Sequence, residues 1–403
     1  MSTRPAVVPL SRNRDYTVLW TGQLCSELAV ELVLVALPLL VLARTGSALQ
    51  VGVVGSALAT ATLLAAIPAG SAVDRWDRRT LLLCCQAGRV AAHATLVVAL
   101  VGGGFPLALV LIALVVEGVL GSVFDPAEHA ALPSVVPAPQ LPLAVARNAA
   151  RPYLATLLGP ALAGLLFTLD PVWPFAAALA VLGLSAAGLL LLRLPARPAA
   201  RTPLGRGGTG AGLRWVWRTR SIRATLVWQA LTNLVFNAVV VVVLALSHEN
   251  GASSGELGLV VACLGAGGVL GALVAARVST ALPPAAAVLG FAWLVTVAVG
   301  AMAFVPAGLP AGLLLGCAAL LAPVANTAVS THQLVVTPDE LRGRMSATCG
   351  FGTGGAAAAG PVLGGALVAA TGDGGTALAL CAVAFGLLAA GATASRTLRR
   401  FAG

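Results

Sequence analysis

Apolar segments of about 20 residues or more recur along the whole chain, and no other feature constrains its fold as strongly. Such a segment, wound as a helix, is long enough to cross the hydrocarbon core of a bilayer. Clusters of Gly, Pro and Asp separate neighbouring segments and predict tight turns. With 59% hydrophobic residues, the chain carries far more apolar surface than a soluble fold can bury. The sequence therefore predicts an all-α integral membrane protein.

Hydropathy and turn signals together predict twelve membrane spans. Alternate connections between the spans, and both ends of the chain, are rich in arginine. Such an excess of positive charge is typical of the cytoplasmic loops of membrane proteins. Both termini are therefore expected in the cytoplasm of a bacterial cell, with the protein in the cell membrane. The predicted spans are 18–43, 48–73, 80–102, 106–126, 146–168, 172–193, 222–247, 255–278, 285–305, 308–332, 345–371 and 374–395.

Two glycine landmarks recur at the same interval. Gly271 lies 201 residues after Gly70, and Gly360 lies 201 residues after Gly159. One shared interval predicts a duplicated unit, and repeats of this kind are typical of transporters whose halves rock about a central site. We expect two pseudo-symmetric six-helix bundles. The predicted organisation is a cytoplasmic N-terminus 1–17, a first bundle 18–193, a cytoplasmic linker 194–221, a second bundle 222–395 and a cytoplasmic tail 396–403.

Several function classes are excluded by composition. All 24 basic residues are arginine, so neither a phosphate-binding P-loop nor a lysine Schiff base is possible. The seven cysteines form no CxxC pair, and neither HExxH nor GxSxG occurs. His129 beside Asp125 and Glu128 is a single histidine and does not make a metal site. We therefore expect that the chain is not an enzyme and that it binds no metal, no cofactor and no nucleic-acid partner.

Three stretches resemble the major facilitator superfamily. "GSAVDRWDRR" (70–79) resembles that family's cytoplasmic loop signature between helices two and three, and "LLGPALAGLL" (157–166) is similar to the helix-five signature of its antiporters. The opening of the chain and "VVTPDELRGRMSAT" (335–348) are similar to the branch of bacterial drug and siderophore exporters. The resemblance implies a twelve-helix transporter that works by alternating access, and we expect a monomer.

The charged loop at 70–79 has a second interpretation besides topology. Arginines alone would satisfy the positive-inside bias, so an acid is not required there. We expect the loop to act as a latch that joins the two bundles when the cytoplasmic mouth is closed, whereas a surface charge run is the alternative. The predicted latch consists of Gly70, Asp74, Arg75, Arg78 and Arg79.

Three carboxylates are expected within the membrane. Glu27 and Glu31 lie one helical turn apart on one face of the first span, and Glu117 lies in the fourth. Ionisable residues at this depth are expensive and mark functional sites, so we expect at least one of them to exchange protons. The alternative is a structural pair with Arg89 or His93. Arg89 itself is expected to be a structural partner of Glu117 or of Asp125.

The second half offers neutral polar residues instead. A stripe on the seventh span and a pair in the tenth are expected to line the cavity and bind substrate, although hydrogen bonds between helices are the alternative. Two Gly-Pro pairs, Gly159-Pro160 and Gly360-Pro361, are expected to kink their helices. The cavity candidates are Gln229, Asn233, Asn237, Asn326 and Thr327.

The linker 195–220 is rich in arginine and contains Trp215 and Trp217. A flexible linker is the favoured interpretation, and a basic amphipathic segment on anionic lipid is the alternative.

These features together predict a secondary active transporter that exports small amphiphilic molecules by proton antiport, with the substrate, protons and the lipid bilayer as its partners. A proton-coupled solute importer is the first alternative. A transport-inactive membrane scaffold or sensor is the second.

Overall fold

A computed structural model describes residues 9–192, 210–281, 283–338 and 341–399. This part of the chain is helical, and it contains no strand. The all-α fold predicted from the apolar segments is therefore confirmed. The linker boundaries at 194–221 stay a prediction, because residues 193–209 lie outside the described ranges; so do the outermost parts of both predicted tails.

Six long helices precede the linker. Polar caps begin several of them: the side chain of Asn13 accepts a hydrogen bond from the Tyr16 amide, and Ser47 and Asp77 cap the second and third helices in the same way. Gly46 ends the first helix in the left-handed conformation, with φ of 62°. The helices are α1 (Arg14–Thr45), α2 (Ala48–Arg75), α3 (Arg78–Val101), α4 (Leu107–Val135), α5 (Leu141–Leu169) and α6 (Trp173–Leu191), with short 3-10 turns at Leu10–Arg12 and Ala138–Gln140.

The second half repeats this arrangement with one interrupted helix. The predicted tenth span divides at Leu321 into α11 and α12, because Pro323 has no N–H to continue the helical hydrogen bonds. The remaining elements are α7 (Gly210–Arg218), α8 (Arg220–Glu249), α9 (Ser254–Ala281), α10 (Pro284–Met302), α11 (Leu309–Leu320), α12 (Ala322–Val336), α13 (Arg342–Thr371), α14 (Gly374–Ala394) and α15 (Arg396–Arg399).

Eleven helical segments within the described ranges are long and apolar enough to cross a membrane, with α11 and α12 counted together as Leu309–Val336. The apolar part of α5 is shorter and covers Leu154–Leu169. The protein is therefore a multi-pass membrane protein.

The predicted spans 106–126 and 146–168 belong to helices that are longer than the spans themselves. α4 continues to Val135 and α5 begins at Leu141, so only a short turn joins them. Ala127, Ala131 and Leu132 are almost fully buried at helical spacing in one cluster with Phe124. This packing stabilises α4 across Pro126 and Pro133.

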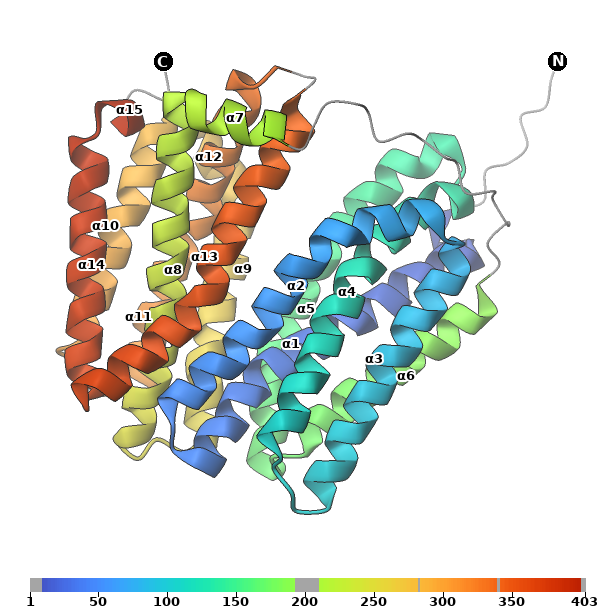
Figure 1. Ribbon diagram of the computed structural model, residues 1–403, viewed down its shortest axis with the longest axis horizontal. Helices are drawn as coiled ribbons and strands as arrows, with labels where there is room; N and C mark the ends of the chain where they lie inside the picture. The colour runs from blue at the N-terminus through green and yellow to red at the C-terminus, as the bar shows by residue number, and fades with distance from the viewer. Residues whose placement is uncertain (1–8, 193–209, 282, 339–340, 400–403) are drawn as a thin grey trace.

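The two halves meet through glycines. A Cβ atom on Gly258 of α9 would lie 2.7 Å from the Cα of Gly164 in α5, and one on Gly52 of α2 would lie 2.9 Å from the carbonyl carbon of Pro361 in α13. Such backbone contact is possible only without side chains. Figure 1 shows the two halves meeting at one end, where α2 and α13 come together, and diverging toward the end of the molecule that carries both termini.

Candidate functional site

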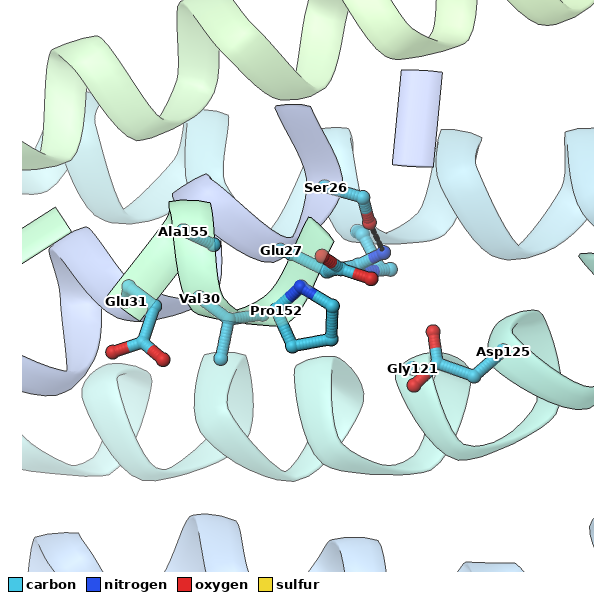
Figure 2. A pocket seen from close by; sticks show the side chains of 9 residues that line it. Ser26, Glu27, Val30, Glu31, Gly121, Asp125, Pro152 and Ala155 are labelled. Atoms are coloured by element: carbon cyan, nitrogen blue, oxygen red, sulfur yellow. Dashed lines mark hydrogen bonds between the residues drawn. The ribbon is translucent and has the colours of Figure 1, made fainter. Parts of the chain in front are cut away.

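Helices α1, α3, α4 and α5 of the first half surround a cavity of about 270 Å³. Glu27, Val30 and Glu31 share one face of α1 because they are spaced three and four residues apart. Figure 2 shows the carboxylates of Glu27, Glu31 and Asp125 around this space. The lining residues are Ser26, Glu27, Val30, Glu31, Arg89, Gly121, Asp125, Pro152 and Ala155.

Arg89 is one of two arginines buried beside this cavity. Its Nε donates to both carboxylate oxygens of Glu117, at 2.9 and 3.0 Å, and its Nη1 donates to Ser26 and to Gln86. His93 Nδ1 lies 3.7 Å from Glu117 as well. Of the two partners expected for Arg89, the structure places Glu117 against it. Glu117 therefore lies in an ion pair and not as an isolated acid.

Arg151 of α5 is the other buried arginine, and the sequence did not single it out. Its Nη1 and Nη2 donate to the two carboxylate oxygens of Glu128 in α4, each at 3.1 Å, and both side chains are 1% exposed. No hydropathy signal could reveal this pair, because Glu128 lies beyond residue 126, where the fourth span was predicted to end. The sequence signal that could have found it is the four-residue spacing of Phe124 and Glu128, and the structure shows both residues buried on a face of α4 that continues past Pro126.

Glu27 lies beside this pair without joining it. Its Oε1 is 3.8 Å from Arg151 Nε, which is too long for a hydrogen bond. Glu27 Oε2 and Arg151 Nε are both buried, and neither has a hydrogen-bond partner in the described part of the chain. A small movement of either side chain would join the two groups directly.

Glu31 is held by α5. Its Oε1 accepts a hydrogen bond from Thr156 Oγ1 at 2.8 Å. A Cβ atom on Gly159 would overlap the Cβ of Glu31, so α1 and α5 approach this closely only because residue 159 is glycine. In the second half, a Cβ on Gly360 would lie 2.5 Å from the Cβ of Asn237. Glu31 and Asn237 thus each pack against one of the two Gly-Pro pairs of the repeat.

Asp125 faces the cavity one turn before Glu128 on α4. Its Oδ1 accepts a hydrogen bond from Gln23 Nε2 at 2.8 Å, and the residue is exposed. Among the described residues, no group of three or more His, Cys, Asp or Glu side chains is arranged to hold a metal ion.

The neutral candidates of the second half contact one another in part. Gln229 Nε2 donates to Asn326 Oδ1 at 3.0 Å, which joins α8 to α12, and Asn237 Nδ2 donates to the carbonyl of Asn233. Thr327 Oγ1 donates to the carbonyl of Pro323 within its own helix. The acids described in this half, Glu249, Glu256 and Asp373, all lie at helix ends. Amides and hydroxyls predominate among the interior polar groups described here, together with the imidazole of His332 in α12.

The predicted latch is described only in part. The side chains of Gly70, Asp74 and Arg75 lie outside the described residues. Arg79 Nη2 donates to the carbonyl of Leu190 at 3.3 Å, which joins this loop to the end of α6. Arg78 begins α3 beside it.

Asp77 caps α3 in the same loop. The amide and hydroxyl of Thr80 both donate to Asp77, and these hydrogen bonds lower the pKa of the Asp77 carboxyl.

Known proteins resemble the chain over nearly its full length. A model of the transmembrane secretion effector family matches residues 5–401. The multidrug efflux pump Tap of Mycobacterium tuberculosis is 32% identical over 398 residues, covering 91% of this chain and 90% of the pump. Tap of Mycolicibacterium fortuitum is 30% identical over 366 residues, covering 86% of this chain and 87% of the pump.

Solved structures show the same fold at low sequence identity. A D-xylose-proton symporter superposes with a TM-score of 0.71 at 14% identity, covering 97% of this chain and 98% of the symporter. A bacterial homologue of the lysosomal transporter Spinster, solved in an inward-facing state, gives 0.68 at 16% identity, covering 97% and 99%. The chain is therefore a membrane transporter, not an enzyme, and it belongs to the transmembrane secretion effector family of the major facilitator superfamily.

Proposed function

We propose that the protein exports small amphiphilic molecules, cationic ones preferentially, in exchange for protons. One observation carries the proposal: the cavity of the first half holds more carboxylates than arginines. Arg89 pairs with Glu117 and Arg151 with Glu128, which leaves Glu27, Glu31 and Asp125 without a basic partner in hydrogen-bond contact. An uncompensated carboxylate in such a site is expensive, and a proton or a cationic substrate relieves that penalty.

Exchange follows if the two relieving partners exclude one another. When Glu27 is protonated it is neutral, and Arg151 then pairs with Glu128 only. Once Glu27 loses its proton, it attracts a cationic substrate into the cavity, or it draws Arg151 across the gap of 3.8 Å. Proton and substrate thus compete for one group of acids, which is the requirement for antiport. Glu31 and Glu117 are the other proton candidates, and Asn233 and Asn237 with Gln229, Asn326 and Thr327 supply hydrogen bonds to cargo.

Export requires the two ends to open in turn. The glycine contacts between α2 and α13 and between α5 and α9 close the end opposite the termini. We place the diverging end at the cytoplasm, because the arginine-rich segments gather there. Residues 70–79 then lie where the two halves must meet for the outward-facing state. The multidrug efflux pumps that the chain resembles support export as the direction.

Everted membrane vesicles with an acidic interior test this function. We expect them to accumulate a cationic dye such as ethidium, and we expect the Glu27→Gln/Glu31→Gln/Glu117→Gln variant to lose the response to the gradient. The Asn233→Ala/Asn237→Ala variant is the matched control, with amides removed from the other half, and it should still respond at higher dye concentration. Gradient-driven accumulation that survives in the acid variant, or dye movement out of the vesicles, would refute proton antiport export.

The latch is proposed separately. Asp74→Asn should reach the membrane in normal amount and lower transport at least tenfold, because the closed cytoplasmic end loses its acid. Asp77→Asn removes the same charge three residues away while keeping a side chain that caps α3, so it should transport normally. Equal transport by the two variants would remove the latch.

A further inference from the structure

Helix α7 is attached to the second half at the end of the molecule that carries both termini. Figure 1 shows it lying across the ends of α8 and α13. Val216 is fully buried in a small cluster with Ile222, Met345 and Cys349, and Trp215 Nε1 donates to Thr337 Oγ1 at 3.4 Å. The prediction of a flexible linker is therefore wrong for residues 210–218, because these contacts hold a helix in place.

The rest of the described surface of α7 divides into two stripes. Leu213 and Trp217 lie four residues apart and are 50% and 53% exposed, which leaves an apolar stripe uncovered by protein. Arg214 and Arg218, also four residues apart, are exposed on the neighbouring stripe. At about 100° per residue, the basic stripe lies roughly opposite Val216, and the apolar stripe lies on the flank between them.

Basic charge continues from α7 into the first turns of α8. Arg220 and Arg223 are exposed there, and Arg223 Nη1 donates to the carbonyl of Trp217 at 2.9 Å. No carboxylate of the described chain forms an ion pair with any of these four arginines; the salt bridges found there all involve Arg89, His93, His129 or Arg151. The patch therefore presents positive charge at the surface of the described chain.

We propose that α7 is an interfacial helix that binds the phosphate headgroups of anionic phospholipids. Its position fits this partner, because the ends of membrane-spanning helices lie at the level of the headgroups. The apolar stripe can then enter the lipid while the arginines reach phosphate oxygens, and a tryptophan beside them is the side chain preferred at such interfaces. Anionic lipid would thereby hold the start of the second half, through α7, α8 and α13, at a fixed depth.

Native mass spectrometry of the full-length protein tests the proposal with phosphatidylglycerol and phosphatidylcholine at equal concentration. We expect the wild type to bind phosphatidylglycerol preferentially. Each arginine at an anionic surface contributes a factor of about 5, so Arg214→Gln/Arg218→Gln should lower the preference by about 25-fold. The matched control is Arg396→Gln/Arg399→Gln, which removes two exposed arginines from α15 at the same end and should keep the preference.

Equal loss in the two double variants would overturn the proposal, since any positive charge at that end would then suffice. So would a wild type that binds both lipids equally. A second measurement places the apolar stripe: a photoreactive benzoylphenylalanine replacing Leu213 should cross-link to lipid in nanodiscs containing phosphatidylglycerol. Cross-links to protein alone would contradict the interfacial position. Lipid binding requires no transport, so these outcomes are independent of the proposed antiport.

Discussion

The two halves share one backbone design and differ in the chemistry of their interiors. In each half a Gly-Pro pair packs against the partner half: a Cβ on Gly265 would lie 3.3 Å from Pro160, and one on Gly55 would lie 3.3 Å from Pro361. The glycines of these pairs, Gly159 and Gly360, allow α1 and α8 to approach closely in the two halves. The residue that packs against the glycine is Glu31 in the first half and Asn237 in the second.

This difference in interior chemistry suggests that rocking of the two halves and coupling to protons depend on different residues. Two rocking halves need matching close contacts, so the glycines are repeated. The proposed proton exchange needs ionisable groups in one place only, and the first half holds Glu27, Glu31 and two buried arginine–carboxylate pairs. The cavity candidates of the second half are amides and a hydroxyl, which can bind cargo without titrating.

The largest expected contrast between the halves is in stability. Arg151→Met leaves Glu128 buried with only the exposed His129, 3.5 Å away, as a basic neighbour, which should lower the free energy of unfolding by about 3–5 kcal/mol. The counterpart in the second half is the neutral buried pair in which Gln333 Nε2 donates to Thr225 Oγ1 at 3.2 Å, and Gln333→Leu should cost about 0.6 kcal/mol.

Thermal unfolding of the purified variants in detergent measures both effects. Replacing both members, as Glu128→Leu/Arg151→Met, should recover much of the loss because no unpaired charge remains. Equal destabilisation by Arg151→Met and Gln333→Leu would show that the buried ion pair of the first half contributes no more to stability than the neutral pair of the second.

The repeated glycines should give an intermediate effect that is the same in the two halves. Gly159→Ala and Gly360→Ala each force a methyl group against a neighbouring helix, at an expected loss of about 1–3 kcal/mol and of most transport. Gly183→Ala and Gly290→Ala are the controls, one in each half, because a Cβ at either position meets no atom within 4 Å. Dye transport at equal expression is the readout. A transport defect in only one of the two glycine variants would contradict the prediction that the two halves contribute alike.

The smallest effect is expected at helix ends, where the halves are again alike. Hydrogen bonds from Thr80 lower the pKa of Asp77, and hydrogen bonds from Thr376 lower the pKa of Asp373. A carboxyl with a lowered folded pKa stabilises the protein above the ordinary aspartate value of 3.8, and this contribution is lost as the pH falls through the lower folded value.

Asp77→Ala should therefore cost about 1 kcal/mol at neutral pH, and the difference from wild type should vanish only below pH 3.8. Asp77→Asn keeps a cap that does not titrate and should lie close to wild type at pH 7. Unfolding curves of Asp77→Ala and Asp373→Ala between pH 2.5 and 7 should both show a stability difference from wild type that shrinks as the pH falls. A stability difference that grows in acid would contradict the prediction.

Local pattern was sufficient to predict much of this molecule from its sequence. Runs of apolar residues predicted the helices, the shared interval of 201 residues predicted the repeat, and the spacing of Glu27 and Glu31 predicted a common face. The pair of Arg151 and Glu128 was missed because it depends on two helices that meet in space. Pro126 and Pro133 also concealed the continuation of α4, which packing of Ala127 and Ala131 stabilises. Helix α7 was underestimated because its contacts lie far along the chain, at Thr337 and Met345.

Proton release on substrate binding tests most directly whether coupling resides in the first half alone. Purified protein in weakly buffered detergent solution is mixed with ethidium, at concentrations where fluorescence polarisation shows equal bound fractions for each variant. Wild type and Asn233→Ala/Asn237→Ala should release protons, and Glu27→Gln/Glu31→Gln/Glu117→Gln should release none. Release that persists in the acid variant, or that disappears in the amide variant, would contradict the account.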